Sequence, residues 1–332
     1  MAASGTSRVL VVQDAAFPAE LQAAVDARFR SVISPGFAPP PGLPEPAQVL
    51  LSASHDAVTG DVLDAFGGTI KVVSNFGVGY DHIDEAACTE RGVLLGNTPN
   101  VLTAATAEMA LALLLAHARR VVEGDARSRD PSLTRIDTSW MSKQVAGSTV
   151  GIVGLGRIGH AVATRCLAFG ASIAYHQRHR APPDQEASLG DAAWCETLHA
   201  LLASSDFVVL CCSCTAETRG LISSAQLSCM RPGAVLVNIG RGALVDQEAV
   251  ALALERGALG GYATDVTDPE PLPEGHALLR APRCIITPHT GSATVRTRKA
   301  MLDLALANIA AALAGSTMPA SPNQDALASK TA

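Results

Sequence analysis

The stretch Thr149-Val150-Gly151-Ile152-Val153-Gly154-Leu155-Gly156-Arg157-Ile158-Gly159 decides the fold. Its apolar first half predicts a strand at Thr149–Val153, and a helical pattern, Ile158–Phe169, follows it. Between the two, the spacing Gly-x-Gly-x-x-Gly is typical of a dinucleotide-binding strand–turn–helix unit. The first glycine permits the tight turn, the second lets a pyrophosphate approach the backbone, and the third lets the helix pack closely on the strand. The helix N-terminus offers unpaired N–H groups to phosphates, so we expect a dinucleotide here.

Short apolar runs alternate with helical patterns on both sides of this stretch. Before it, strands are predicted at Val9–Val12, Val49–Ser52, Ile70–Asn75 and Val93–Leu95. After it, strands are predicted at Ser172–His176, Phe207–Cys211, Ala234–Asn238, Gly261–Asp265 and Cys284–Thr287. Continuous apolar strands separated by helices are typical of parallel sheets covered on both faces. The predicted fold class is therefore α/β, with two Rossmann-like, doubly wound parallel-sheet domains and the active site in the cleft between them.

Helical patterns divide the chain further. Short helices are predicted at Ala19–Phe29, Thr59–Phe66 and His82–Arg91. The proline- and glycine-rich segment Pro35–Pro46 predicts a surface loop. A long helix from Leu102 to about Val121 begins a second unit, and Glu123–Gly147 follows as an arm without clear periodicity. The last helix, Ala293–Ala314, is expected to return and pack on the first domain.

Length and composition limit the class of protein. A chain of 332 residues exceeds what one core usually supports, so two domains are expected. We predict a discontinuous substrate-binding domain at residues 1–99 plus 290–332 and a dinucleotide-binding Rossmann domain at residues 100–289. Hydrophobic residues at 48% and charged residues at 17% exclude a disordered chain. The net charge of −6 does not attract nucleic acid or anionic lipid, so neither is expected as a partner.

Neither a targeting segment nor a metal site is indicated. The N-terminus lacks the basic region and long apolar run of a secretory signal. The most apolar stretch, Met109–Ala116, is far shorter than the roughly 20 residues of a membrane span, so we expect a soluble, cytoplasmic protein. Cys211, Cys212 and Cys214 close an apolar strand, with no second Cys/His pair at zinc-finger spacing. These cysteines are expected to be small buried thiols.

The end of the second Rossmann strand bears on cofactor choice. An NAD site needs an acid about 20 residues past the glycines, where it accepts from the ribose 2′-hydroxyl. Here no acid occurs before Asp184; Gln177 holds the expected acidic position, and Arg178 and Arg180 follow. A carboxylate repels a 2′-phosphate, whereas guanidinium groups pair with it. The pattern favours NADP(H) over NAD(H), and the alternative is that these arginines belong to a solvated loop.

Three later segments each place polar residues at the end of a predicted strand: Asn238–Gly242, Asp265–Pro271 and Thr287–Ala293. Ligands of an open α/β sheet lie at these carboxyl ends. Hydride transfer to a ketone needs a proton donor for the oxygen and a cation for a substrate carboxylate. Arg241, Glu270 and His289 supply both. Taken singly, each has another interpretation, as an exposed cation, a turn acid or a turn histidine.

Together these segments resemble the D-2-hydroxyacid dehydrogenase family. The matching motifs are Val78-Gly79-Tyr80-Asp81, Gly154–Gly159, Gly240-Arg241-Gly242, Glu270-Pro271 and Pro288-His289. Asn97-Thr98-Pro99, Pro269–Pro273 and Gly291-Ser292-Ala293-Thr294 are similar to the glyoxylate/hydroxypyruvate reductase branch, which is 2-ketogluconate reductase-like. The resemblance implies an NADPH-preferring reductase of small 2-keto acids such as glyoxylate, hydroxypyruvate or 2-ketogluconate.

The resemblance also implies residue roles. His289 would be the general acid, Glu270 would orient its imidazole and favour its protonated form, and Arg241 would bind the substrate carboxylate together with the N–H groups of Val78 and Gly79. Asp265 would contact the nicotinamide carboxamide. The full set of expected cofactor contacts is Thr106, Gly154, Leu155, Gly156, Arg157, Ile158, Gln177, Arg178, Arg180, Cys211, Thr218, Ile239, Asp265, His289 and Gly291.

The family resemblance implies a homodimer in which the arm Glu123–Gly147 wraps the partner. Trp140 is similar to a reductase tryptophan that reaches the neighbour's substrate pocket; the alternative is packing within its own subunit. Two other functions stay open at this point. One is a dinucleotide-sensing, corepressor-like scaffold, which typically keeps the acid that Gln177 replaces. The other is an NAD-dependent D-2-hydroxyacid dehydrogenase. A formate dehydrogenase-like enzyme is disfavoured, because that branch has Gln in place of Glu270.

Overall fold

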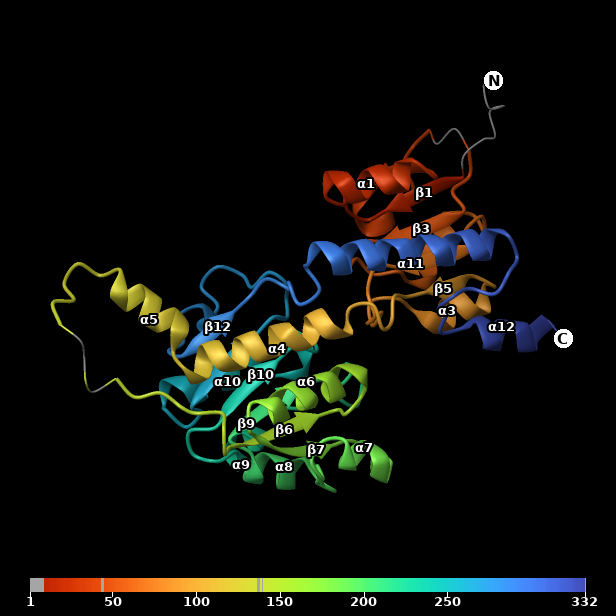
Figure 1. Cartoon of the computed structure of the whole chain (residues 1–332). Helices are drawn as coiled ribbons and strands as arrows, with labels where there is room; N and C mark the ends of the chain where they lie inside the picture. Colours follow the sequence, from red (N-terminus) through yellow and green to blue (C-terminus); the bar gives the residue numbers. More distant parts are fainter. Residues whose placement is uncertain (1–8, 43–44, 136–137, 139, 332) are drawn as a thin grey trace. The chain divides into compact units, whose positions relative to one another are not determined.

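The computed structural model describes residues 9–42, 45–135, 138 and 140–331 (Figure 1). The chain forms two compact units, one from Met1–Leu102 with Thr294–Ala332 and the other from Thr103–Ala293. Each unit contains one parallel sheet, of five strands in the first and seven in the second. Two parallel-sheet α/β domains are the fold class that the alternating strands and helices predicted. No helix in the described part of the chain combines the length and apolar character needed to cross a membrane.

The first unit has the strand order β2-β1-β3-β4-β5, with every neighbouring pair parallel. Its strands are β1 (Leu10–Gln13), β2 (Arg30–Ile33), β3 (Val49–Ser52), β4 (Val72–Asn75) and β5 (Leu94–Gly96). Its helices are α1 (Ala19–Asp26), η1 (Pro35–Phe37), α2 (Gly60–Ala65), α3 (Glu85–Glu90), α11 (Val295–Leu313) and α12 (Gln324–Thr331). The long helix α11 packs on β4 and β5, where the Ser74 hydroxyl donates to the Ala305 carbonyl at 3.1 Å.

The edge strand β5 is covered by one side chain from the C-terminal segment. The Asn323 Oδ1 accepts from the Leu95 N–H at 2.9 Å, and its Nδ2 donates to the Val93 carbonyl at 3.0 Å. Asn323 is fully buried, and the Asn97 N–H bonds the Ala320 carbonyl nearby. One amide side chain thus satisfies backbone groups that a sixth strand would otherwise bond.

The second unit has the strand order β12-β11-β10-β9-β6-β7-β8, again all parallel. Its strands are β6 (Thr149–Val153), β7 (Ser172–His176), β8 (Ala193–Trp194), β9 (Phe207–Leu210), β10 (Val235–Asn238), β11 (Gly261–Thr264) and β12 (Cys284–Ile286). Its helices are α4 (Thr103–Ala118), α5 (Val121–Ser128), α6 (Arg157–Ala168), α7 (Pro183–Ala187), α8 (Leu198–Ser204), α9 (Ser224–Cys229), η2 (Gly242–Leu244), α10 (Gln247–Glu255) and η3 (Ala277–Leu279).

The strand order of the second unit locates its ligand edge. From β6 the chain proceeds outward through β7 and β8, then returns to β9 on the other side of β6. The crevice at the carboxyl ends of such neighbouring strands is where open α/β sheets bind ligands. The core behind it is made of fully buried strand residues such as Ile152, Phe207 and Val237, with α4 packed on α6, β10 and β11. The glycine-rich turn after β6 lies at this reversal.

Several predicted boundaries were wrong for identifiable reasons. The helix expected from Leu102 to about Val121 ends at Ala118, because Arg120 has the left-handed φ of 54° and separates α4 from α5. The arm expected to be irregular contains most of α5. The helix expected from His82 begins only after Asp84, whose carboxylate accepts from the Ala87 N–H at 2.8 Å and caps it.

Candidate active site

The glycine-rich turn has one open position and two closed ones. Gly154 has a φ of 88°, and a Cβ there would lie 2.9 Å from the Cys212 Cα. A Cβ on Gly159 would overlap the Gly154 carbonyl, so the absence of a side chain at Gly159 is what lets α6 lie directly on the turn. A Cβ on Gly156, the N-cap of α6, would meet none of the described atoms within 4 Å. The bare backbone at the start of α6 therefore fits the approach of a pyrophosphate group.

The segment after β7 holds the residues predicted to select the cofactor. The Gln177 Oε1 accepts from the Leu155 N–H of the glycine-rich turn at 3.0 Å. Arg178 is exposed, and none of the described residues forms a hydrogen bond or ion pair with it. Arg180 instead pairs with Glu186, through Nε at 2.9 Å and Nη2 at 2.8 Å. The two predicted arginines thus have different surroundings, and only Arg178 lacks an ion pair of its own.

The other predicted cofactor residues lie around the same edge of the sheet. A Cβ on Gly291 would lie 3.7 Å from the Thr106 side chain in the first turn of α4. Thr218 closes its own loop, accepting from the Thr215 N–H at 2.7 Å and donating to the Ser213 carbonyl at 2.8 Å. Arg157 and Ile158 begin α6, Cys211 follows β9, and Ile239 follows β10.

Cys211, Cys212 and Cys214 are half-buried, not fully buried as the sequence predicted. Burial raises the pKa of the Cys211 thiol well above its ordinary range, and raises that of Cys212 to about 11. Both side chains are therefore protonated at neutral pH and are neither nucleophiles nor thiolate ligands there.

The three predicted catalytic segments follow three adjacent strands, β10, β11 and β12. After β10, Asn238 is fully buried and holds the turn: its Nδ2 donates to the Arg241 carbonyl at 2.8 Å, and its Oδ1 accepts from the Gly240 N–H at 3.0 Å. A Cβ on Gly242 would overlap the Thr267 backbone, so the Gly-Arg-Gly turn lies directly against the segment after β11. Asn238 was not predicted as a site residue, although its place at a strand end was a usable signal.

Asp265 holds the loop that carries His289, the histidine predicted to be catalytic. Its carboxylate accepts from the Thr287 hydroxyl at 2.6 Å, the Thr290 N–H at 2.8 Å and the Gly291 N–H at 2.6 Å. Its carbonyl accepts from the His289 N–H at 2.8 Å, where His289 has a φ of 51°, unusual for a non-glycine residue. These four bonds impose the left-handed backbone at His289 and so set the direction of its side chain.

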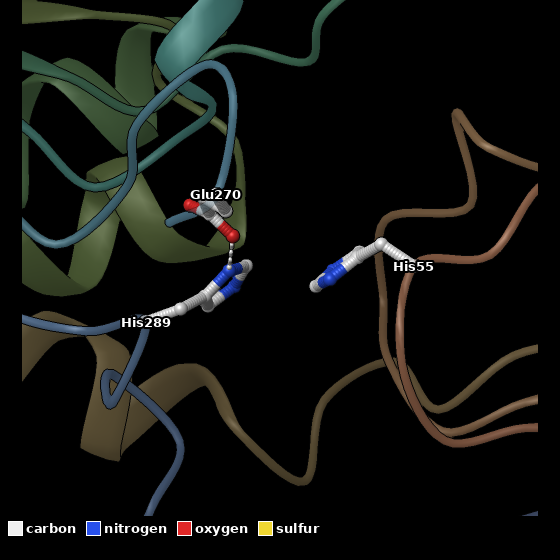
Figure 2. Close-up of side chains that lie close together, drawn as sticks. All are labelled: His55, Glu270 and His289. Atoms are coloured by element: carbon white, nitrogen blue, oxygen red, sulfur yellow. Dashed lines mark hydrogen bonds and ion pairs between the residues drawn. The ribbon is translucent and has the colours of Figure 1, made fainter. Parts of the chain in front are cut away.

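His289 and Glu270 form a direct pair, shown in Figure 2. The His289 Nδ1 and the Glu270 Oε2 are 2.9 Å apart, and both side chains are 31% exposed. The other Glu270 oxygen accepts from the Thr267 N–H at 2.8 Å, which fixes the carboxylate. An ionised carboxylate can only accept, so the His289 Nδ1 is the donor in this bond. A histidine held by a carboxylate in this way can serve as a general acid–base group.

The predicted carboxylate cradle belongs to the first unit. The carbonyls of Gly77 and Gly79 accept from the Asn75 amide at 3.0 and 2.9 Å, and the Val78 carbonyl accepts from the Asn97 amide at 3.0 Å. The Asn75 and Asn97 side chains that bond these carbonyls are buried. The N–H groups of Val78 and Gly79, by contrast, donate to no acceptor within the described residues. Unpaired, half-buried N–H groups of this kind are suited to an anionic oxygen.

Trp140 packs against its own arm. The Arg120 guanidinium lies 3.6 Å from the centre of the Trp140 ring, a cation–π contact within the subunit. The Trp140 ring also lies close to Gly124 of α5. This contact is packing within the subunit, one of the two arrangements that the sequence allowed for Trp140. It does not test whether Trp140 also reaches the substrate pocket of a second copy of the chain.

Comparison with known proteins agrees with this geometry. Residues 111–291 match the family described as D-isomer specific 2-hydroxyacid dehydrogenase, NAD binding domain. The glyoxylate reductase/hydroxypyruvate reductase of Mus musculus is 42% identical over 274 residues, which cover 82% of this chain and 83% of the mouse protein. The glyoxylate reductase of Thermococcus gammatolerans is 39% identical over 281 residues, covering 83% of each chain.

A solved structure extends the similarity to nearly the whole chain. The NADPH-dependent glyoxylate/hydroxypyruvate reductase of Sinorhizobium meliloti, crystallised with NADP and malonate, is 32% identical with a TM-score of 0.85. The similarity covers 95% of this chain and 97% of that one. The chain therefore belongs to the D-isomer specific 2-hydroxyacid dehydrogenases, a family of oxidoreductases, and carries their NAD-binding domain.

Proposed function

We propose that the protein is an NADPH-preferring reductase that converts small 2-keto acids of the glyoxylate, hydroxypyruvate or 2-ketogluconate class to 2-hydroxy acids. The single observation that carries the chemistry is the 2.9 Å pair between His289 and Glu270 at the ligand edge of the sheet. The relatives named as glyoxylate and hydroxypyruvate reductases support the substrate class.

Each residue has a defined part in this reaction. The glycine-rich turn and the N-terminus of α6 would hold the dinucleotide, and a nicotinamide bound there would supply a hydride for the keto carbon. His289 donates a proton from Nε2 to the keto oxygen, and Glu270 stabilises the imidazolium and holds the ring in place. Arg241 binds the substrate carboxylate and polarises the carbonyl, assisted by the N–H groups of Val78 and Gly79. In the direction of oxidation, His289 accepts the hydroxyl proton.

A panel of 2-keto acids assayed at 340 nm with NADPH and NADH tests this function. We expect turnover with glyoxylate or hydroxypyruvate and a higher kcat/KM with NADPH. Oxidation of the nicotinamide without a keto acid would reveal a contaminating activity, so each assay is run with and without substrate. A protein that binds dinucleotide but turns over no 2-keto acid is instead a dinucleotide sensor, and the proposal fails.

The cofactor preference is assigned to Arg178. A charge-assisted hydrogen bond is worth about 1.5–3 kcal/mol, so one engaged arginine gives roughly 10- to 100-fold preference for NADPH. We expect Gln177→Asp combined with Arg178→Ala to reverse the preference toward NADH. Arg178→Ala removes the positive charge for the 2′-phosphate, and Gln177→Asp adds a carboxylate that can accept from the ribose 2′-hydroxyl. The measurement is kcat/KM for both cofactors in each variant.

A matched arginine controls this test. Arg231 forms an ion pair with Asp206 at 3.2 Å and follows α9, away from the glycine-rich turn. Arg231→Ala removes the same charge from the surface and is expected to leave the NADPH to NADH ratio unchanged. A wild-type preference for NADH would show that Arg178 belongs to a solvated loop.

We also propose a homodimer formed through the arm. Val121 and Val122 just before the arm and Met141 within it are exposed, Met141 at 73%, and exposed apolar side chains favour a protein partner. Light scattering is expected to give twice the chain mass at micromolar concentration. If Trp140 also reaches the partner's substrate, Trp140→Ala raises the KM of the keto acid about two- to tenfold while the mass is unchanged. A monomeric mass contradicts the proposal.

A further inference from the structure

The five-residue helix α7 makes side-chain contacts with both cofactor-binding segments of the second unit. Glu186, whose side chain is only 10% exposed, accepts two hydrogen bonds from the Arg180 guanidinium, at 2.9 and 2.8 Å. It also accepts from the Tyr175 hydroxyl. Arg180 is itself 62% exposed, so the pair has a buried acid and an exposed base. Such a carboxylate fixes the guanidinium more firmly than two exposed partners would.

The Tyr175 hydroxyl closes the β7–α7 loop, residues 177–182, onto the strand that precedes it. Tyr175 is fully buried in β7, and its oxygen accepts from the Ala181 N–H at 2.9 Å. The His176 Nδ1 bonds the Cys195 carbonyl at 2.9 Å at the start of the loop. Both ends of the loop are therefore fixed to the sheet, one through His176 and one through Tyr175.

The same helix also contacts the glycine-rich turn. The Gln185 Nε2 donates to the Leu155 carbonyl at 3.1 Å, while the Leu155 N–H donates to Gln177. The backbone of Leu155 is thus hydrogen-bonded to Gln177 of the β7–α7 loop and to Gln185 of α7. The turn that would hold the pyrophosphate and the loop that would face the ribose are joined into one hydrogen-bonded unit.

Two residues of the β7–α7 loop take no part in this network. Arg178 and His179 are exposed, and the described residues offer neither of them a hydrogen bond or an ion pair. The hydrogen bond from the Thr215 hydroxyl is the main cause that lowers the pKa of Glu217 in the loop after β9, and the Arg178 charge makes a smaller contribution. Arg178 is therefore the arginine of this loop that stays available for a ligand anion, while Arg180 is committed to Glu186.

We propose that Glu186 is a positioning residue for cofactor selectivity: by binding Arg180 and Tyr175 it holds the β7–α7 loop in the conformation that presents Arg178 to the ribose 2′-phosphate. This inference rests on the proposed NADPH preference and adds a residue that never touches the cofactor. Arg180 and Tyr175 hold the pKa of Glu186 at about 2, so the network is intact across any neutral assay range.

Glu186→Gln tests the inference with little change of shape. We expect the KM for NADPH to rise about five- to tenfold, since Arg178 must then be ordered at the moment of binding. The KM for NADH and the kcat at saturating NADPH should change less than twofold. A residue that merely supports the fold would instead impair both cofactors alike. Thermal unfolding is measured for each variant, and Tyr175→Phe and Arg180→Ala provide the same test if Glu186→Gln does not fold.

The decisive measurement is a double-mutant cycle with Arg178→Ala. If Glu186 acts through Arg178, then Glu186→Gln and Arg180→Ala have no further effect on the NADPH KM once Arg178 is alanine. A loss that persists for Arg180→Ala in that background means that Arg180 binds the phosphate itself and overturns the inference. Equal effects of Glu186→Gln on both cofactors, or none on NADPH, also overturn it. If Arg178→Ala alone leaves the NADPH KM unchanged, the proposed cofactor preference is what fails.

Discussion

Replacing His289 with alanine is expected to lower kcat for keto-acid reduction by about 100-fold or more, the usual loss when a positioned acid–base group is removed. The hydride acceptor carbon is unaffected, but the developing alkoxide loses its proton source. Asp265 holds the loop through main-chain N–H groups and the Thr287 and Thr290 hydroxyls, so the backbone survives the change. Initial rates over a range of substrate concentrations separate this loss in kcat from any change in KM.

Two variants control the histidine test. His199 is an exposed histidine of α8, and His199→Ala is expected to leave kcat unchanged. Glu270→Gln keeps the shape of the orienting group but removes its charge, so kcat for keto-acid reduction is expected to fall. Near-normal kinetics for His289→Ala at neutral pH would refute the mechanism.

Replacing Arg241 with alanine is expected to lower kcat/KM by about 100- to 1000-fold, with KM raised and kcat reduced together. In the proposed mechanism the Arg241 guanidinium binds the substrate carboxylate in the ground state and stabilises the developing oxyanion in the transition state. Arg241→Lys keeps the positive charge but not the planar guanidinium that can bind a carboxylate through two hydrogen bonds, so its kcat/KM should lie between those of wild type and Arg241→Ala. Steady-state kinetics with saturating NADPH measure wild type and both variants.

Binding of the dinucleotide alone distinguishes this role from a structural one. Asn238 holds the Arg241 backbone through the carbonyl, so truncating the side chain leaves the turn intact. Fluorescence titration with NADPH should therefore give the same affinity for wild type and Arg241→Ala. A large loss of dinucleotide affinity would show that the substitution disturbs the glycine-rich turn rather than the substrate carboxylate site.

Most strands that were predicted correctly are largely apolar, although β7 was predicted correctly despite its polar ends, Ser172 and His176. β3, β6 and β9 are buried throughout or nearly so, and the run of Val, Leu and Ile side chains signals this directly. β2 (Arg30–Ile33) was missed because it is an edge strand with an exposed Arg and a polar Ser, which removes the apolar signal. β8 is only two residues long. The helix break at Arg120 carries no glycine or proline to announce it.

The candidate site was predictable where a short motif implies one chemistry, as with Gly154–Gly159 and the Pro288-His289 pair. It was not predictable where the function depends on which side chain pairs with which. Arg178 and Arg180 look equivalent in the sequence, and only the contact between Arg180 and Glu186, six residues apart across a loop, separates them. The placement of the active site between the two units stays a prediction.

The single amide of Asn323 has a consequence for how the protein behaves in a crowded solution. By satisfying the Leu95 N–H and the Val93 carbonyl, it removes from β5 the exposed hydrogen-bonding row on which a foreign strand could form. β5 itself is apolar, with the sequence Leu-Leu-Gly, so its uncovered edge would be a template for aggregation. Resistance to aggregation is therefore expected to depend on a polar residue more than 200 positions along the chain from the strand that it shields.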